Sequence, residues 1–500
     1  MMFLKHSKLV SSATVVAVLL FIQVKLEFAQ TPFNKVFDYE NGFEFGWSVI
    51  INPDSSYSIM AGGENNFFTL GILFYHIGPN GALQYKKGYF NPLTDYYPGL
   101  SKTMKAIDNG GFFFAGASDY YYSIDVDVIV SKLDASGDTI YFRGIETGNI
   151  DGAYNHTITS DKGFAITGFT TPDYYTSTNL LIMKVDSNGN YLCSKSYGSD
   201  ESDSGYTIYE ISGKRLIIAG IKRYLSTNYA TWIIETDSLG NVLKEKEWDS
   251  GALFCGGTSL APGFNSKYFL EGCLDTLINL DDYPICGFVA QLDTDFSILW
   301  KTIYNDKDYK SFYIVKQLPD STIVSVGFQT DGLSNNTRGW IAKIDKNGNQ
   351  LWEHSCKFGN STFNYFSDFE QTWDKGFIIT GATNGPTSQD AWLVKLDSLG
   401  CLNPNNCFTG DLTIEISDKV EFRIAPNPAS NHTNIIYNLF GKNVNAEFII
   451  TDLTGRIVNC IPVNFSENVL SLDVSQWSQG VYVCSLLIDN KKKHLARSLL

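Results

Sequence analysis

An acidic loop is the first stretch whose residue types could bind an ion. The segment "DKNGN" (345–349) places oxygen-bearing side chains on alternate residues, as calcium loops do. An EF-hand loop, however, has Gly at its sixth position and Glu at its twelfth. Here Gly348 is fourth and Cys356 is twelfth. We therefore expect Asp345 to form an Asx-type turn, with Gly348 or Asn349 at positive φ in a hairpin, and we expect no metal site.

Candidate catalytic groups are few. The sequence contains no G-x-S-x-G, no H-E-x-x-H and no P-loop, and its cysteine spacings resemble no zinc framework, so we expect no cofactor. Residues 30–400 contain three histidines, each in a different repeat: His76, His156 and His354. His156 is the best placed, on an inner strand. A structural role is nevertheless favoured for all three.

Tyrosines and acids gather in long loops, and this pattern fits ligand binding best. Rigid aromatic planes beside carboxylates suit stacking on sugars or contact with another protein. The alternative is that these tyrosines only pack their loops against neighbouring repeats. The candidate ligand-binding residues are Tyr96, Tyr97, Tyr120, Tyr121, Tyr122, Tyr174, Tyr175, Asp119, Asp173 and Asp282, with Asp95 and Asp281 in the same loops.

An internal repeat supplies the elements that hold these loops. A β-rich segment ending in Gly, such as "DKGFAITG" (161–168), recurs with spacings of 52–55 residues. Its terminal glycines are Gly62, Gly116, Gly168, Gly220, Gly272, Gly327 and Gly381. A second apolar segment with an Asp-Gly turn, such as "LIMKVDSNGN" (181–190), follows each copy.

Each period predicts four antiparallel strands, for example at 153–159, 164–169, 180–185 and 191–197. Seven such periods predict an all-β fold, a seven-bladed β-propeller over 30–400. The last period lacks its fourth strand, and segment 33–39 is expected to supply it and close the ring. A parallel solenoid is the competing repeat fold. Strand alternation would place the long loops on one face and the tight turns on the other.

Bulk properties restrict the partners. A formal charge of −15 excludes the basic stripe that nucleic acids need. Residues 1–29 are typical of a signal peptide, with an N-terminal membrane anchor as the alternative, and the mature chain is expected to contain no transmembrane segment. Cys401 and Cys407 are close enough to form a disulfide loop in a linker at 401–420.

The composition changes after this linker, and 421–500 is predicted to form a small immunoglobulin-like β-sandwich. Three of its segments, "IAPNPASN" (424–431), "TDLTGRIV" (451–458) and "GVYVCSLLIDNKKKHLARSLL" (480–500), resemble the C-terminal sorting domain of type IX secretion in Bacteroidota. An ordinary accessory domain is the alternative. The motif residues are Pro426, Asn427, Pro428, Gly455, Arg456, Gly480, Val481 and Tyr482. The resemblance implies export by the type IX machinery, and often removal of the tag and attachment to the cell surface.

Together these features predict a secreted or cell-surface binding or scaffold protein that contacts a polysaccharide or a protein through its long-loop face. Two alternatives remain open. One is a secreted glycoside hydrolase or polysaccharide lyase, although no pair of facing carboxylates can be chosen from the sequence. The other is an adhesion or surface-layer component without a small ligand.

Overall fold

The computed structural model describes residues 30–100, 102–121, 126–173, 176–224, 228–249, 259–275, 285–304, 308–330, 336–385 and 388–402 of a first unit. In the C-terminal unit it describes 420–425, 429, 431–439, 446–452, 456–463, 469–478, 480–488 and 491–499. The chain divides into two compact units after Cys407. The predicted signal peptide at 1–29 and most of the predicted linker lie outside the described residues.

The described part of the first unit consists of antiparallel sheets, numbered here from first to seventh along the chain. The first three contain β2 (Glu44–Ile51), β3 (Tyr57–Glu64), β4 (Leu70–Ile77) and β5 (Leu83–Tyr89); β6 (Thr94–Pro98), β7 (Met104–Ala106), β8 (Phe112–Tyr120), β9 (Val126–Leu133) and β10 (Thr139–Ile145); β11 (Ile150–Ile158), β12 (Phe164–Thr171), β13 (Asn179–Val185) and β14 (Tyr191–Tyr197).

The fourth to sixth sheets contain β15 (Ser204–Ile211), β16 (Arg215–Tyr224), β17 (Asn228–Thr236) and β18 (Val242–Asp249); β19 (Ser259–Pro262), β20 (Tyr268–Asp275), β21 (Ile285–Leu292) and β22 (Ile298–Tyr304); β23 (Lys310–Gln317), β24 (Ile323–Thr330), β25 (Thr337–Ile344) and β26 (Gln350–Cys356). The seventh contains β27 (Asn364–Gln371), β28 (Phe377–Asn384), β29 (Gln389–Leu396) and β1 (Phe33–Phe37). A short 3₁₀ turn, η2 (Phe264–Ser266), precedes β20.

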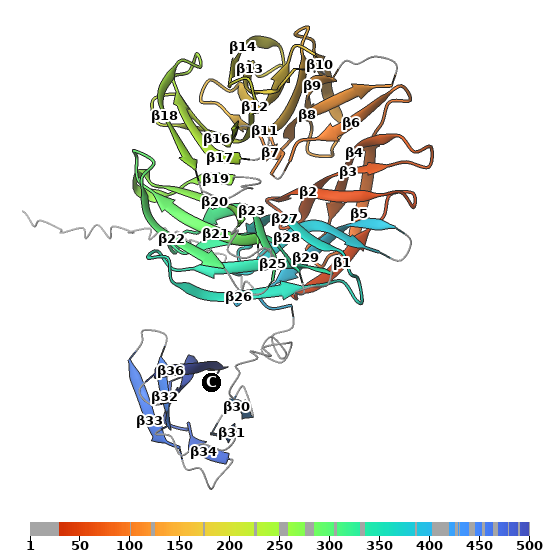
Figure 1. The fold of residues 1–500 in the computed structure, drawn as a ribbon. Coiled ribbons are helices and arrows are strands. Elements are labelled where there is room, and N and C mark those ends of the chain that lie inside the picture. Colours follow the sequence, from red (N-terminus) through yellow and green to blue (C-terminus); the bar gives the residue numbers. More distant parts are fainter. Residues whose placement is uncertain are drawn as a thin grey trace, which may run out of the picture. The chain divides into compact units, whose positions relative to one another are not determined.

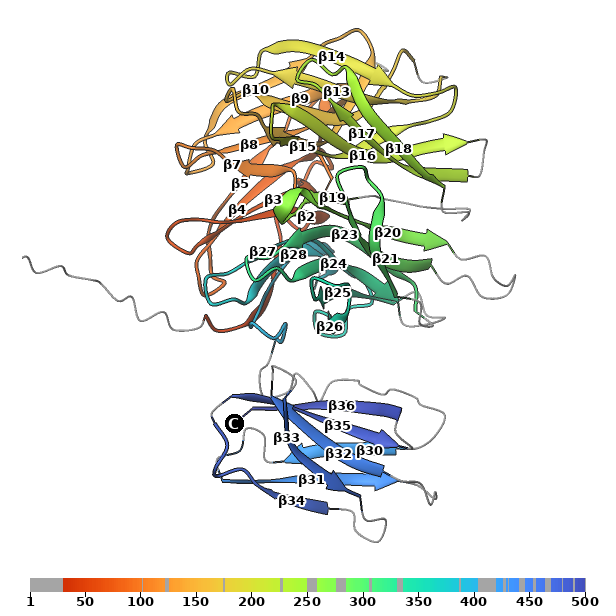
Figure 2. The ribbon, with the colours of Figure 1, turned by 90° about the vertical axis from the view of Figure 1, so that its left-hand side faces the viewer.

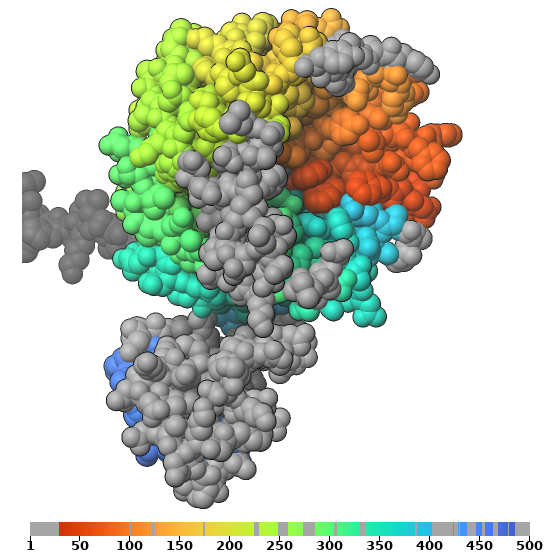
Figure 3. Space-filling model, viewed as in Figure 1, coloured from red at the N-terminus to blue at the C-terminus, as the bar shows by residue number. Residues whose placement is uncertain are grey.

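The sheets are arranged radially, with the first strand of each nearest the centre (Figure 1). This is the arrangement of a β-propeller, so the predicted all-β class and the four-stranded repeat are confirmed. The first sheet packs against the seventh, as the red and cyan surfaces in Figure 3 show. Here β1 pairs antiparallel with β29, with Phe33 opposite Lys395 and Phe37 opposite Ala391.

The hydrophobic core lies between neighbouring sheets. Ile182 of the third sheet, for example, shares a buried cluster with Ile218 and Trp232 of the fourth. Another cluster joins Val49 and Leu73 of the first sheet to Leu393 of the seventh. Because both faces of these sheets are covered by their neighbours, the middle strands are rich in buried apolar residues.

The repeated glycine has a steric origin. A β-bulge interrupts the first strand of the third sheet between Ala153 and Asn155, directly opposite Gly168. A Cβ atom at Gly168 would lie 1.9 Å from the carbonyl oxygen of Gly152. At Gly381 the same construction meets the carbonyl oxygen of Tyr365 at 1.7 Å. In the third and seventh sheets the bulge therefore requires glycine at this position of the repeat.

The acidic hairpin loop is a turn, as predicted. Asp345 Oδ1 accepts hydrogen bonds from the main-chain N–H of Asn347 (2.8 Å) and of Asn349 (2.9 Å), and Gly348 has φ 89°. Burial raises the pKa of Asp345, but these bonds and that from the Asn349 side chain bring it below its ordinary value. The same pattern of bonds to residues two and four positions later occurs at Asp134, Asp186, Asp237, Asp293 and Asp397.

The C-terminal unit contains two antiparallel sheets (Figure 2). One contains β30 (Val420–Ala425), β31 (His432–Leu439) and β34 (Val469–Asp473); the other contains β33 (Ile457–Pro462), β32 (Ala446–Asp452), β35 (Val481–Ile488) and β36 (Lys491–Leu499). One buried cluster, including Ile435 and Tyr437 from the first sheet and Phe448 and Cys484 from the second, joins them.

Candidate functional site

Six of the ten predicted ligand-binding residues lie in the described part of the chain: Tyr96, Tyr97, Asp119, Tyr120, Tyr121 and Asp173. The other four, Tyr122, Tyr174, Tyr175 and Asp282, lie outside the described residues. Five of the six belong to the second sheet, around the pair formed by β6 and β8. The structure therefore brings most of the described residues together on one sheet edge.

The segment that holds Tyr96 and Tyr97 differs from the expectation. Both tyrosines were expected in a long loop, whereas residues 94–98 form β6 and pair with the end of β8. Two separate strands, β6 and β7, thus take the innermost place that one strand occupies in the other sheets. The site is mounted on a strand pair, which fixes its side chains more firmly than a loop would.

Two carboxylates and two tyrosines share one face of this strand pair. Asp95 is directly opposite Asp119, and Tyr97 is two residues from Asp95 on the same strand. The hydroxyl of Tyr121 donates to Asp95 Oδ1 at 2.6 Å, and the N–H of Leu70 donates to the same oxygen at 2.9 Å. The turn that begins β4 is thereby joined to β6.

Two groups at this strand pair, Asp119 and Tyr121, have raised pKa values. Burial, together with the charge of Asp95, raises the pKa of Asp119. The hydrogen bond to Asp95 is the main cause of a raised pKa at Tyr121, with burial second. A carboxyl group whose pKa is raised by burial and a neighbouring charge is a feature that acid–base catalysts also use.

Tyr96 lies on the opposite face of β6 and is structural. Its ring is 4.8 Å from that of Phe142, it packs on the core cluster of the first and second sheets, and its hydroxyl accepts a hydrogen bond from Asn91 Nδ2. Tyr96 therefore packs its segment against the neighbouring sheet, which is the alternative to ligand binding that the sequence left open.

The sequence analysis missed the most exposed aromatic residues of this region. Phe67 and Phe68 are 84% and 82% exposed, in the turn between β3 and β4. The side chain of Asn65 accepts hydrogen bonds from the N–H groups of Phe67 and Thr69 and holds the turn. Consecutive phenylalanines in the loop "GENNFFTLG" (63–71) were a visible signal, because apolar residues between turn formers have no strand to bury them.

These residues form what we call the aromatic patch. The N–H of Tyr121 donates to the carbonyl oxygen of Leu93, which is itself 57% exposed. Tyr97, Tyr120 and Tyr121 are 39%, 39% and 45% exposed. The aromatic patch therefore consists of Phe67, Phe68, Leu93, Tyr97, Tyr120 and Tyr121, with Asp95 and Asp119 beside it.

Asp173 belongs to the third sheet and has a local role in the turn after β12. Its Oδ1 accepts the N–H of Thr176 at 2.9 Å, and its carbonyl oxygen accepts the hydroxyl of Thr171. The described contacts do not join it to the aromatic patch.

The inner strands carry charged groups whose hydrogen-bonding capacity is used within the protein. Asp368 of β27 is fully buried, and its Oδ2 accepts Ser48 Oγ (3.2 Å) and the N–H of Val49 (3.1 Å). Its Oδ1 pairs with Lys316 Nζ at 3.1 Å. Burial lowers the pKa of Lys316, but Asp368 and Glu370 outweigh it and raise the pKa above its ordinary value. We call this set the inner junction.

His156, the best placed histidine of the sequence analysis, is fully buried on β11. Its ring packs edge-on against Phe113 at 4.9 Å. Burial, then the charge of Lys105, lowers its pKa well below the ordinary value, so the imidazole is neutral. Packing accounts for this residue.

In the C-terminal unit, four of the eight motif residues are described. Arg456 closes a hairpin by bonding Asp452 through its N–H and Nε, both at 3.1 Å. Gly480 directly precedes β35, which begins at Val481, and Tyr482 donates its hydroxyl to the carbonyl oxygen of Ser478 at 2.8 Å. Pro426, Asn427, Pro428 and Gly455 lie outside the described residues.

Cys401 is buried and disulfide-bonded. Its predicted partner, Cys407, lies outside the described residues, so this pairing stays a prediction. Among the described residues, we find no helix with the length and apolar character needed to cross a membrane.

Comparison with known proteins identifies the C-terminal unit. Residues 423–497 match the family described as Secretion system C-terminal sorting domain. No curated protein matches the chain.

Several solved structures are similar to this chain at low identity. PorZ of Porphyromonas gingivalis, described as an essential bacterial surface component of the type-IX secretion system, is 10% identical, with a TM-score of 0.30 over 89% of this chain and 69% of that chain. Drosophila Semaphorin 2a is 8% identical, with a TM-score of 0.45 over 93% and 97%. A PL25 ulvan lyase is 10% identical, with a TM-score of 0.47 over 75% and 99%. Identities of this size carry no information on activity.

The match at 423–497 confirms the predicted sorting domain. The chain is therefore a type IX secreted β-propeller protein that carries a C-terminal sorting domain.

Proposed function

We propose that this secreted propeller is a binding or scaffold protein whose aromatic patch contacts a polysaccharide. The observation that carries the proposal is the exposure of Phe67 and Phe68, each more than four-fifths exposed, beside the half-exposed Tyr97 and Tyr121. Large apolar side chains gathered at one place on a secreted protein mark an interaction surface. Aromatic faces next to carboxylates suit the apolar faces and hydroxyl groups of sugars.

The architecture supports this role. We infer that the seven sheets are the blades of one closed seven-bladed propeller, that β1 closes the ring, and that the two C-terminal sheets are an immunoglobulin-like sandwich. Strand alternation then puts the connections 65–69 and 90–93, and Tyr121 after β8, on one face. We further propose that 1–29 is a signal peptide.

A glycan array probed with the full chain tests the binding proposal. We expect retention of particular acidic or neutral polysaccharides and loss of at least about tenfold in affinity in the double variant Phe67→Ala/Phe68→Ala, because alanine scanning attributes about 2 kcal/mol or more to central aromatic contacts. Tyr191→Ala is the matched control, because Tyr191 is 47% exposed on β14, outside the aromatic patch.

Equal binding by the wild type and the double variant would overturn the proposal. Retention of a surface protein in place of any glycan would replace the polysaccharide with a protein partner. Retention of neither would favour an adhesion or surface-layer component without a small ligand.

A glycoside hydrolase or polysaccharide lyase is the second candidate, favoured by one observation. Asp95 and Asp119 are neighbours on one face, and the pKa of Asp119 is raised. Such a pair could serve as base and acid. Release of reducing or unsaturated ends by the wild type and not by Asp119→Asn would establish it.

A further inference from the structure

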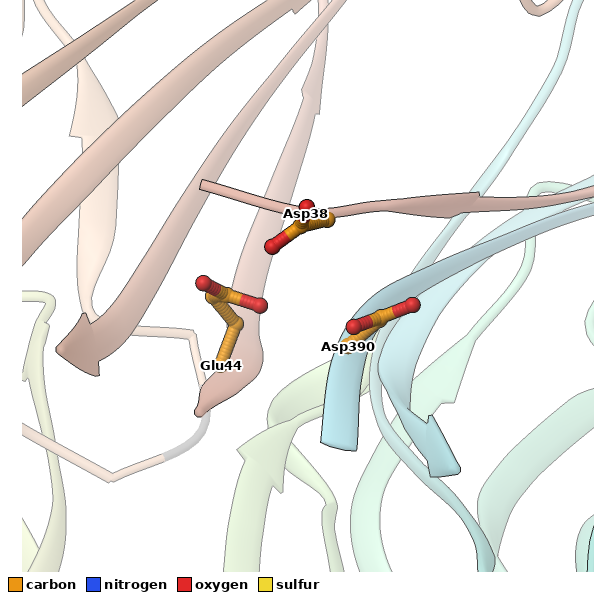
Figure 4. Close-up of side chains that lie close together, drawn as sticks. All are labelled: Asp38, Glu44 and Asp390. Atoms are coloured by element: carbon orange, nitrogen blue, oxygen red, sulfur yellow. The ribbon is translucent and has the colours of Figure 1, made fainter. Parts of the chain in front are cut away.

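Three carboxylates meet where the first and seventh sheets adjoin. Asp38 directly follows β1, Glu44 begins β2, and Asp390 is the second residue of β29. Figure 4 shows the three side chains grouped, each from a separate segment. One carboxylate oxygen of each lies within 4.8 Å of the others. We call this set the acidic cluster.

Each carboxylate uses one oxygen for a hydrogen bond. Glu44 Oε1 accepts the N–H of Tyr39 at 3.1 Å, and Asp38 Oδ1 accepts that of Asn41 at 2.7 Å. Asp390 Oδ1 accepts the hydroxyl of Ser388 at 3.1 Å. These bonds orient the three carboxylates and use only one oxygen of each.

The second oxygens of the two buried acids have no partner. Glu44 and Asp390 are 0% and 1% exposed, and Glu44 Oε2 and Asp390 Oδ2 are buried without a hydrogen bond. The fully buried hydroxyl of Tyr75 is also without a partner. Buried carboxylates are normally paired, bonded or bound to a metal, because an unpaired one is costly.

The basic group of this region does not neutralise the cluster. Lys86, an exposed residue of β5, donates to the carbonyl oxygen of Asp38 at 3.0 Å and lies over the ring of Tyr39. Burial, then the charges of Asp38 and Asp390, raises the pKa of Glu44 to about 8, and Lys86 is the smallest of the influences on it. Burial also raises the pKa of Asp390 and that of Tyr75.

We propose that Asp38, Glu44 and Asp390 bind one calcium ion that joins the first and last sheets of the ring. Two oxygens on opposite sides of an ion, each about 2.4 Å away, are about 4.8 Å apart, so the observed spacing fits a single shared ion. Three carboxylate oxygens without nitrogen or sulfur select a hard cation rather than zinc or copper. Calcium fits better than magnesium, which demands near-ideal octahedral geometry and keeps its waters.

Titration calorimetry on the full chain, first freed of divalent cations with a chelator, tests the site. We expect calcium to bind with a Kd of about 10⁻³ M or tighter, the range of extracellular calcium modules and sensors. Glu44→Gln and Asp390→Asn each lower the affinity at least about tenfold, because each removes a charged ligand. Asp295→Asn, at a carboxylate 82% exposed in the fifth sheet, is the control and binds like the wild type.

Thermal unfolding gives the second readout. Calcium should raise the Tm of the wild type and of Asp295→Asn, and should not raise that of Asp390→Asn, since a ligand stabilises only the state that binds it. If Glu44→Gln or Asp390→Asn does not fold, Asp38→Asn replaces it, because Asp38 is only partly buried.

Absence of calcium-dependent heat in the wild type, or equal binding by the variants, would overturn the proposal and leave a shared proton as the means of neutralisation. Magnesium binding at an equal or lower Kd would overturn the choice of calcium.

Discussion

The first and seventh sheets are joined at two buried acidic places that differ in how their charge is balanced. At the inner junction, Asp368 receives donors from Ser48 and Val49 on one oxygen and Lys316 on the other. At the acidic cluster, Glu44 and Asp390 each keep one buried oxygen without a partner. Both places hold buried carboxylates where these two sheets meet, but only the inner junction includes a lysine, Lys316 from β23 of the sixth sheet.

At the inner junction the protein's own groups balance the buried charge. At the acidic cluster the unpaired oxygens are left for a ligand from solution. A buried carboxylate with a full set of donors needs no further partner, and removal of the carboxylate is destabilising. Such a pair is not by itself proof of added stability. A group of buried like charges with open oxygens is unfavourable until a proton or a cation arrives. We therefore expect the same substitution to have opposite effects at the two places.

The largest expected effect is that of Asp368→Asn, measured by urea unfolding in chelator. It should lower the free energy of unfolding by about 3 kcal/mol, at the low end for a broken buried ion pair, since Glu370 still neutralises Lys316. Asp390→Asn should raise the free energy of unfolding, because it removes one of the buried like charges that have no partner. Two changes of the same sign would remove the distinction between the two places.

An intermediate effect is expected from pH, again in chelator. The pKa of Glu44 is about 8 in the folded chain and 4.5 for an ordinary Glu, so the folded state holds the extra proton between these values. The stability that Glu44 contributes is complete below pH 4.5 and is lost as the pH rises to about 8. The raised pKa of Lys316 contributes no slope there, because that amine is charged throughout.

The dependence of stability on pH is measured from the midpoints of urea unfolding at about pH 5 and about pH 8. The wild type should lose more stability over the interval than Glu44→Gln does. Parallel losses in the two proteins would show that Glu44 does not titrate in this window and would contradict the prediction.

The smallest expected effect is that of Lys86→Ala. Since Lys86 is exposed and bonds a main-chain oxygen of Asp38, its removal should change the free energy of unfolding by less than about 1 kcal/mol. The control is Lys316→Ala, which should cost several times more. A large loss at Lys86 would mean that this lysine balances the acidic cluster, which would make the two places alike.

The repeat allowed most of the first unit's secondary structure to be predicted. The strands expected at 180–185 and 191–197 are observed at Asn179–Val185 and Tyr191–Tyr197. They are strongly periodic, local and bounded by Asx turns, which are the features that a single sequence reveals. The glycine at the end of each copy was recognised as a marker, but its cause, the bulge on the paired strand, is a contact between strands.

The candidate site was only partly predictable. The cluster of tyrosines was visible in the sequence, but β6 was not, because its pairing with β8 depends on register and the segment ends in Pro98. Which tyrosine faces the core, as Tyr96 does, follows from that register too. The role of the described candidates in binding stays a prediction.

The acidic cluster lay beyond sequence reasoning for a different reason. Asp38 and Glu44 belong to the start of the repeat array and Asp390 to its end, and none stands in a recognised spacing. Only the approach of the first sheet to the seventh makes them neighbours. Similarly, Glu40 and Asn41, with φ of 88° and 61°, show a tight connection between β1 and β2 that the sequence did not indicate.

The pairing of β1 with β29 also has a mechanical consequence. Because Phe33 is opposite Lys395 and the strands are antiparallel, the incoming end of β1 and the outgoing end of β29 lie at the same end of the pair. Tension between Gln30 and Leu402 would therefore load the hydrogen bonds one after another, as in a zipper, and not all at once in shear. A pull along the chain at these two points would separate this strand pair from one end, starting at Phe33.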